Sequence, residues 1–198
     1  MAFKMPHILS DLMTDSREGV RRVKVENDLS SFEDNRQFRF FDRLSIPNGD
    51  YQRVYSINIQ CDTHLLVRAM SLYDGGLKYS VYSQNSPAIF SGTLIDAESK
   101  VFPVNPILRD GLTSHPDNNV LFSTAQGENI FNPNGAIESI GFDVLASSGP
   151  RSLTSEIDIA SIQLGFAEGT QLWVVFDVLP GVLGTSSGVF EYVWEECV

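Results

Sequence analysis

Strict alternation of apolar and polar residues is the feature that most constrains the fold of this 198-residue chain. In residues 55–61, YSINIQC, every second side chain is apolar, which is the pattern of a strand with one buried face. A similar alternation, or a similar enrichment in β-branched and aromatic residues, recurs at 20–26, 37–41, 77–83, 88–95, 119–125, 136–145 and 189–195. The pattern predicts an all-β body that begins near residue 20.

Turn-forming clusters separate these segments, among them IPNGD, SHPDNN, NPNG and LPGVLG. Gly, Pro, Asn and Asp supply the backbone angles that chain reversals need. About ten short strands punctuated in this way are typical of an antiparallel β-sandwich or jelly roll. Residues 172–179, LWVVFDVL, are apolar on both faces, which predicts a central strand packed between two layers.

The first 19 residues differ from this body, because they contain several apolar side chains but are too short to form a core of their own. MPHILSDLM can form a turn or two of helix. We expect residues 1–19 to be an extended N-terminal arm and residues 20–198 to be one β-sandwich domain. The arm either packs on a neighbouring subunit or folds back over an edge of its own sandwich, and we favour the neighbour.

Charge is distributed unevenly along the chain. Eight of the fourteen basic residues and eight of the twenty-five acidic ones lie in residues 1–43, so that residues 44–198 carry six basic and seventeen acidic side chains. Such an acidic body repels phosphate backbones and argues against a nucleic-acid partner. The arginines near the N-terminus could instead pair with an acidic neighbour, including a second copy of this chain.

Cys61 and Cys197 are the only cysteines, which is too few for a disulfide framework or a zinc signature. Pro6, His7 and Asp11 interrupt the apolar start of the chain, so we expect no secretory leader. No apolar run approaches the ~20 residues of a membrane span. We therefore predict a protein with no membrane partner.

Asp74-Gly75-Gly76 is the stretch that most resembles a ligand-binding loop. A phosphate-binding glycine loop is followed by a helix, whereas LKYSVYS after this stretch has the pattern of a strand. The sequence therefore predicts a tight hairpin here.

Other candidate sites have simpler explanations. His115 and Asp117 with Asn118 and Asn119 could bind calcium through oxygen atoms, but such residues also form turns by themselves, and we predict no required metal or cofactor. No nucleophile elbow or zinc-protease motif is present. A glycosidase pair could still be drawn from acids in or beside the predicted strands, namely Asp143, Glu156, Asp158 and Asp177, although such acids usually face solvent.

Tyrosines cluster around the expected hairpin, at positions 51, 55, 73, 79 and 82. Both faces of one predicted sheet are aromatic there, and only one of them can belong to the core. The other face could stack on a sugar or contact another subunit.

An acidic, cysteine-poor β-sandwich with a polar N-terminal arm and Asn-Pro-Asn-Gly turns resembles the virion proteins of tailed bacteriophages, in particular capsid decoration proteins and small tail or fibre-attachment proteins. The resemblance implies a structural protein, not an enzyme, that assembles in the host cytoplasm with copies of itself and with other virion proteins. The alternatives are a carbohydrate-binding β-sandwich module and, third, a glycoside hydrolase. The residues that we expect to contact a partner are Phe3, Ile8, Leu9, Leu12, Arg21, Arg22, Arg39, Tyr73 and Tyr82.

Overall fold

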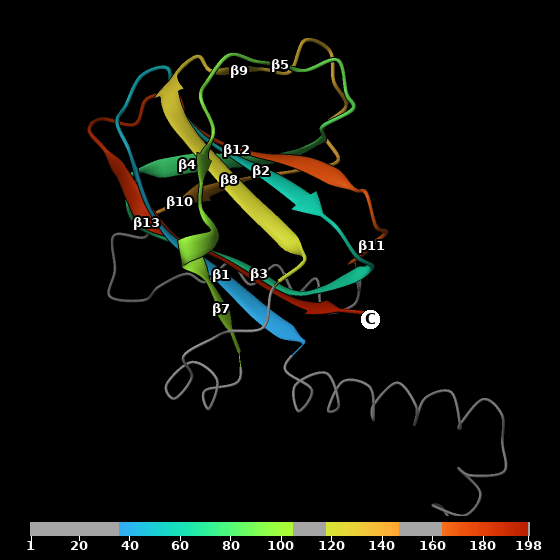
Figure 1. Ribbon diagram of the computed structural model, residues 1–198. Coiled ribbons are helices and arrows are strands. Elements are labelled where there is room, and N and C mark those ends of the chain that lie inside the picture. The colour runs from blue at the N-terminus through green and yellow to red at the C-terminus, as the bar shows by residue number, and fades with distance from the viewer. Residues whose placement is uncertain (1–35, 105–117, 147–163, 198) are drawn as a thin grey trace, which may run out of the picture.

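A computed structural model describes residues 36–104, 118–146 and 164–197, and the structural statements below concern these residues. They form two antiparallel sheets that pack face to face (Figure 1). The five-stranded sheet has the order β11 (Leu164–Phe166), β3 (Thr63–Asp74), β13 (Ser186–Glu196), β1 (Gln37–Ile46), β7 (Val101–Pro103). The six-stranded sheet has the order β10 (Ile140–Leu145), β4 (Gly76–Ser83), β12 (Gln171–Val178), β2 (Tyr51–Ile59), β8 (Val120–Glu128), β6 (Ile95–Asp96).

The strand pairing is that of a jelly roll with an insertion. Eight strands remain when β5 to β9 are set aside, and they pair from the outside inward: β1 with β13, β2 with β12, β3 with β11, and β4 with β10. Nested antiparallel pairs shared between two sheets define this architecture. The predicted fold class, an antiparallel β-sandwich or jelly roll, is confirmed. The proposed arm, residues 1–19, lies outside the described residues, as does the expected strand at 20–26.

The core lies between the two sheets and is rich in aromatic rings. Strand β13 shows how the sequence builds it, because Phe190, Tyr192 and Trp194 alternate with less buried neighbours and point inward. Phe190 is fully buried and packs edge-on against Phe176 of the opposite sheet, with ring centroids 4.9 Å apart. The predicted aromatic face of residues 189–195 is therefore the core face.

The insertion between β4 and β10 adds to both sheets and covers one of them. Within it, β6 and β8 extend the six-stranded sheet, and β7 extends the five-stranded sheet after the short 3-10 segment η1 (Glu98–Lys100). Strands β5 (Ile89–Phe90) and β9 (Phe131–Asn132) form a separate pair, which lies above the six-stranded sheet in Figure 1. We call residues 84–92 and 129–139 the flap.

The flap explains why residues 172–179 are apolar on both faces. Val174 and Phe176 of β12 face the core, whereas Trp173 and Val175 face the flap and pack against Phe131 or its neighbours. The prediction of a central strand between two layers is confirmed.

The Asp74-Gly75-Gly76 stretch is not a hairpin, and that prediction is wrong. It joins β3 of one sheet to β4 of the other, and these two strands do not pair with each other. Gly75 has a φ of +76°, and a Cβ there would lie 2.8 Å from the Cα of Ser186, so a larger residue is excluded by strain and by contact. The Gly75 amide donates to Asp74 and the Gly76 amide to Ser186, so both amides are used within the chain.

Two expected strands are shorter in the structure than in the sequence analysis. The segment 88–95 contains only the two-residue strand β5 and the first residue of β6, and the segment 136–145 becomes regular only at Ile140. Segment 88–95 belongs to the insertion, and segment 136–145 leads from the insertion back to the sandwich. In both, side-chain packing on the flap replaces strand pairing. The other described predicted strands correspond to β1, β2, β4, β8, β12 and β13.

Candidate association surface

The two outer faces of the sandwich differ in how the chain covers them. The flap buries part of the outer face of the six-stranded sheet, where Val54, Tyr82, Phe131 and Val175 form a second apolar cluster. No described residue covers the outer face of the five-stranded sheet in the same way. We call the second surface the open face.

Strand alternation and register define the side chains of the open face. Arg39 of β1 lies opposite Val193 of β13 on one side and Phe102 of β7 on the other, and Val193 lies opposite Val67 of β3. The next row joins Phe41, Glu191 and Ala69 in the same manner. The open face comprises Arg39, Phe41, Arg43, Val67, Ala69, Ser71, Tyr73, Phe102, Val189, Glu191 and Val193.

This surface is apolar for a solvent-facing side of a sheet. Val67 is 46% exposed, Phe102 39% and Tyr73 67%. A hollow of about 260 Å³ lies at its β7 border and is lined by Arg39, Phe41 and Phe102, among others. Contiguous exposed apolar side chains bordered by charged groups are characteristic of interaction surfaces.

Charges on the open face are few and partly paired. Arg39 bonds to Glu191, with 2.5 Å between Nε and Oε1, and its guanidinium lies 5.3 Å from the ring centroid of Phe41. Arg43 is exposed, and no described residue forms an ion pair with it. Glu195, on the same side of β13, is only 5% exposed, so Arg43 is the exposed and unpaired charge of this face.

The structure places two of the residues expected to contact a partner on the same face, at different ends of it, and a third elsewhere. Arg39 and Tyr73 share the open face, where they come from β1 and β3 on either side of β13. Tyr82 is only 5% exposed and lies in the covered cluster, with its ring centroid 5.2 Å from that of Phe131. Burial removes Tyr82 from any contact surface. The remaining expected residues lie outside the described residues: Phe3, Ile8, Leu9, Leu12, Arg21 and Arg22.

Sequence reasoning missed several members of this surface. Phe41, Val67 and Phe102 were not singled out, although QFRFFDRLSI already places Arg39, Phe41 and Arg43 on one side of a strand. The signal that could have found them is a mixture of arginine and aromatic residues on the polar side of an alternating strand.

A second open region lies on the six-stranded sheet, beside the flap. Asp143 of β10, Lys78 of β4 and Asp177 of β12 form one cross-strand row on the outer side. Lys78 bonds to Glu138 at 3.3 Å, and these residues together with Asp143 line a shallow hollow of about 380 Å³. We call it the acidic hollow.

The ends of this row differ in burial. Burial raises the pKa of Asp177, and this effect outweighs the opposing hydrogen bond from Gln52, whose Nε2 lies 2.7 Å from Oδ1 of Asp177. Asp143 is exposed. The register places Lys78 between the two aspartates, so the row is a salt-linked surface and not a cleft flanked by two acids. Glu156 and Asp158, the other members of the proposed glycosidase set, lie outside the described residues.

A buried ionic cluster holds the insertion against the sandwich. Asp42 faces inward from β1 and accepts hydrogen bonds from Arg53 (2.8 Å), from the Tyr55 hydroxyl (2.6 Å) and from Lys100 of η1 (2.7 Å). Burial opposes ionisation of Asp42, but the bonds from Lys100, Tyr55 and Arg53 together outweigh it and lower the pKa of this carboxyl. Every polar group of the cluster has a partner within the fold, which is the arrangement of a structural joint.

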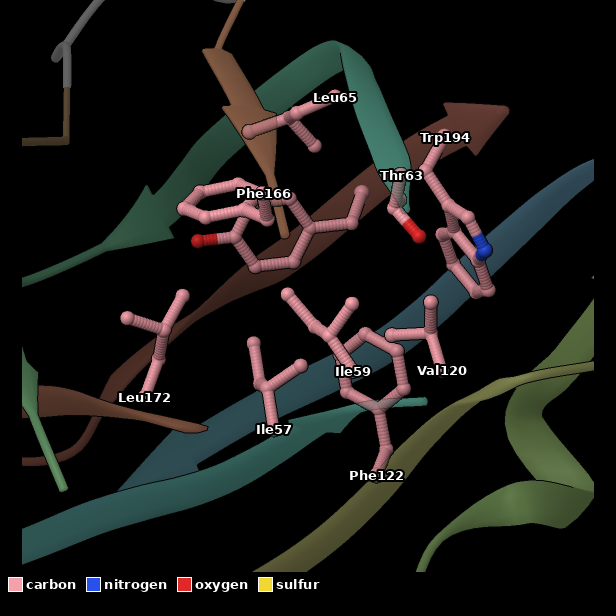
Figure 2. A pocket seen from close by; sticks show the side chains of 10 residues that line it. Ile57, Ile59, Thr63, Leu65, Val120, Phe122, Phe166, Leu172 and Trp194 are labelled. Atoms are coloured by element: carbon pink, nitrogen blue, oxygen red, sulfur yellow. The ribbon is translucent and has the colours of Figure 1, made fainter. Parts of the chain in front are cut away.

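The apolar pocket in Figure 2 lies between the sheets at one end of the sandwich. Leu65, Phe166 and Trp194 of the five-stranded sheet face Ile57, Ile59 and Phe122 of the other across it. Its volume is about 30 Å³, and its lining is almost entirely carbon. This space holds little more than a methyl group, so it is a gap in the packing and not a ligand site.

The predicted calcium loop is described only in part, since His115 and Asp117 lie outside the described residues. Asn118 donates its side-chain amide to Glu98, and Asn119 donates its own to Glu196. These amides face carboxylates of the protein. Among the described residues, no group of three or more His, Cys, Asp or Glu side chains could hold a metal ion.

Cys61 lies just before β3 and Cys197 just after β13, at one end of the five-stranded sheet, and each thiol has a neighbour. Cys61 Sγ is 3.8 Å from the Thr63 hydroxyl, and Cys197 Sγ is 3.6 Å from Nδ1 of His64. Burial raises the pKa of both thiols, which disfavours the reactive thiolate.

No family model matches the sequence, and no curated protein matches it significantly. Within the ranges 36–104, 118–146 and 164–197, no helix is long and apolar enough to cross a bilayer.

Proposed function

We propose that this protein is a structural component of a tailed-phage particle, which assembles with copies of itself and with capsid or tail proteins. The observation that carries the proposal is the open face. The chain covers the outer face of one sheet with its own flap, whereas the described residues leave the outer face of the other sheet apolar. An apolar surface of this kind is stabilised when it is removed from water by a partner.

Chemistry and fold are compatible with this role. The polar clusters of the described residues, around Asp42 and around Glu196, are satisfied by bonds within the chain, and the interior pocket is too small for a substrate. Jelly rolls occur in viral capsid and lectin domains, so the fold is compatible with assembly but does not by itself determine the function.

The carbohydrate-binding alternative has less support. A sugar ring stacks on an exposed aromatic face, and of the five clustered tyrosines Tyr55, Tyr79 and Tyr82 are buried. Tyr73 is well exposed, but it is a single ring beside aliphatic neighbours. Phe41 and Phe102 lie at the β7 border of the open face, on the other side of β13, so they do not form one continuous platform with Tyr73.

Two experiments test the proposal. Mass spectrometry of purified, nuclease-treated particles of the phage that encodes this chain should find it in many copies per particle. Sedimentation velocity of the isolated protein should show self-association that Val67→Lys on the open face weakens and that Ile95→Lys, on the edge strand β6, leaves unchanged. Ile95 is 67% exposed and lies at the opposite edge of its sheet from β10, so the control adds the same charge without affecting the core. Absence from particles, or a monomer at all concentrations, would contradict the proposal.

Removal of residues 1–16 tests the proposed role of the arm separately. If the arm contacts a neighbour, the truncated protein keeps its melting temperature and loses self-association or particle binding. If it assembles normally, or if it unfolds, the arm is not the contact that we propose.

A further inference from the structure

The charges of the open face are not complementary to one another. Of the charged side chains on this side of the sheet, Arg39 and Glu191 are bonded to each other, Glu195 is only 5% exposed, and Arg43 is left exposed. Two open faces packed together would therefore bring two unpaired arginines into one interface with no exposed free carboxylate from either face. Like charges within an interface weaken association.

The acidic hollow has the opposite surplus. Lys78 is bonded to Glu138, and Asp177 accepts a hydrogen bond from Gln52, so Asp143 is the exposed carboxylate without a described partner. Leu145, two residues after Asp143 on the same side of β10, is 65% exposed beside it. The hollow therefore offers a free negative charge beside apolar atoms, and the open face offers a free positive charge beside apolar atoms.

The two regions lie on opposite sides of the sandwich. The open face is the outer side of the five-stranded sheet, and the hollow is on the outer side of the six-stranded sheet at its β10 edge. One copy therefore cannot satisfy its own Arg43 with its own Asp143. A second copy can do so, and each added copy leaves the same two surfaces free at the ends of the assembly.

We propose that copies of this chain associate head to tail, with the open face of one copy on the acidic hollow of the next and with Arg43 paired to Asp143. The inference rests on the proposed function and specifies its contact. A head-to-tail contact joins two different surfaces, so it closes into a ring or continues as a chain, whereas a face-to-face contact ends at a dimer.

A charge exchange tests the contact. Sedimentation equilibrium in low salt should show at least tenfold weaker association for Arg43→Glu and for Asp143→Arg, because each change places like charges opposite each other. The double variant R43E/D143R restores opposite charges and should recover the association constant to within about threefold. An equimolar mixture of the two single variants should also associate, because each contact then joins opposite charges.

Asp50→Arg is the matched control, since Asp50 is exposed in a turn outside both surfaces and the charge change is the same as that of Asp143→Arg. Its association should equal that of the wild type. If Arg43→Glu weakens association but Asp143→Arg does not, or if the double variant fails to recover, the head-to-tail contact is wrong and the open face binds something else. If the wild-type protein does not self-associate, the proposed function fails as well. Thermal melts of all variants should agree, because both side chains are exposed.

Discussion

The two outer faces of the sandwich are built from similar strands but have different neighbours. On the six-stranded sheet, Trp173 and Val175 pack under Phe131 and Phe90 of the flap. On the five-stranded sheet, Phe41, Val67 and Phe102 have no such cover from the described residues. The difference teaches that alternation along a strand identifies the core face but does not tell whether the opposite face is covered or exposed. Coverage of the opposite face depends on segments inserted elsewhere in the chain.

The largest expected effect comes from removing the main anchor of the flap. Phe131 is 3% exposed and contacts the rings of Tyr82 and Trp173, so Phe131→Ala should lower the free energy of unfolding by about 4 kcal/mol. The same truncation on the open face, Phe102→Ala, should cost less than about 1 kcal/mol, because Phe102 is already 39% exposed. Urea denaturation of both variants measures the contrast. Equal losses would mean that the open face is covered after all.

Disruption of the Asp42 cluster, which holds the insertion against the sandwich, should have the next largest effect on the free energy of unfolding. Asp42→Asn leaves Arg53 and Lys100 without their carboxylate and should cost about 3 kcal/mol at neutral pH. Because the pKa of Asp42 is lowered in the folded state, its contribution is complete above the unfolded value near 4 and is lost as the pH falls through the folded pKa. The difference between wild type and variant should therefore shrink in acid. A difference independent of pH down to acid unfolding would show that the charge of Asp42 is not what stabilises the joint.

A smaller effect, with the opposite dependence of stability on pH, is expected at Asp177 beside Lys78. Its raised pKa means that the folded protein holds this proton more tightly than the unfolded chain, so Asp177 contributes more stability as the pH falls from neutral towards its unfolded value. Asp177→Asn keeps an oxygen for the bond from Gln52 and should change stability at pH 7 by less than about 1 kcal/mol. Relative to this variant, the wild type should gain stability as the pH falls from neutral towards the unfolded value near 4. A loss over that range would mean that burial does not dominate at this carboxyl.

The smallest effect on stability should come from the open face itself. Tyr73→Ala removes a side chain that is 67% exposed and should change the free energy of unfolding by less than about 0.5 kcal/mol. In contrast, Tyr82→Ala should cost about 3 kcal/mol because the ring lies beneath the flap. If the open face is an association surface, Tyr73→Ala should weaken self-association while the melting temperature of the monomer stays constant. A weakened association together with a lower melting temperature would point to a structural role.

Most strands could be predicted from the sequence, because the period of two is a local property of each segment. The partners of those strands could not be predicted locally. Asp74-Gly75-Gly76 has the composition of a hairpin, yet it turns from one sheet to the other because β3 and β4 find partners far along the chain, in β13 and β12. The composition correctly indicates a turn at Asp74-Gly75-Gly76, but it does not indicate which strands the turn joins.

The candidate surface was predicted only in part, for a related reason. Tyr73 and Tyr82 both lie in the apolar segments that flank Asp74-Gly75-Gly76, and the sequence pattern predicts a partner contact for both. Their difference arises from Phe131, which lies 49 positions after Tyr82 in the printed sequence and covers it. Arg39 was identified by its charge, whereas Phe41 beside it was missed because its residue type is typical of a core.

The nested pairing of the strands also governs the order in which this protein can fold. β1 pairs along its whole length with β13, so the first described strand of the chain cannot complete its pairing before the last described strand is made. During synthesis, the aromatic side of β1 stays unpaired until β13 has left the ribosome. Contacts between residues so distant in sequence slow folding to the millisecond-to-second range typical of β-sandwiches, and they prolong the exposure of sticky strands. Dilution or a chaperone would therefore reduce aggregation of the newly made chain during the interval before β13 enters the centre of its sheet.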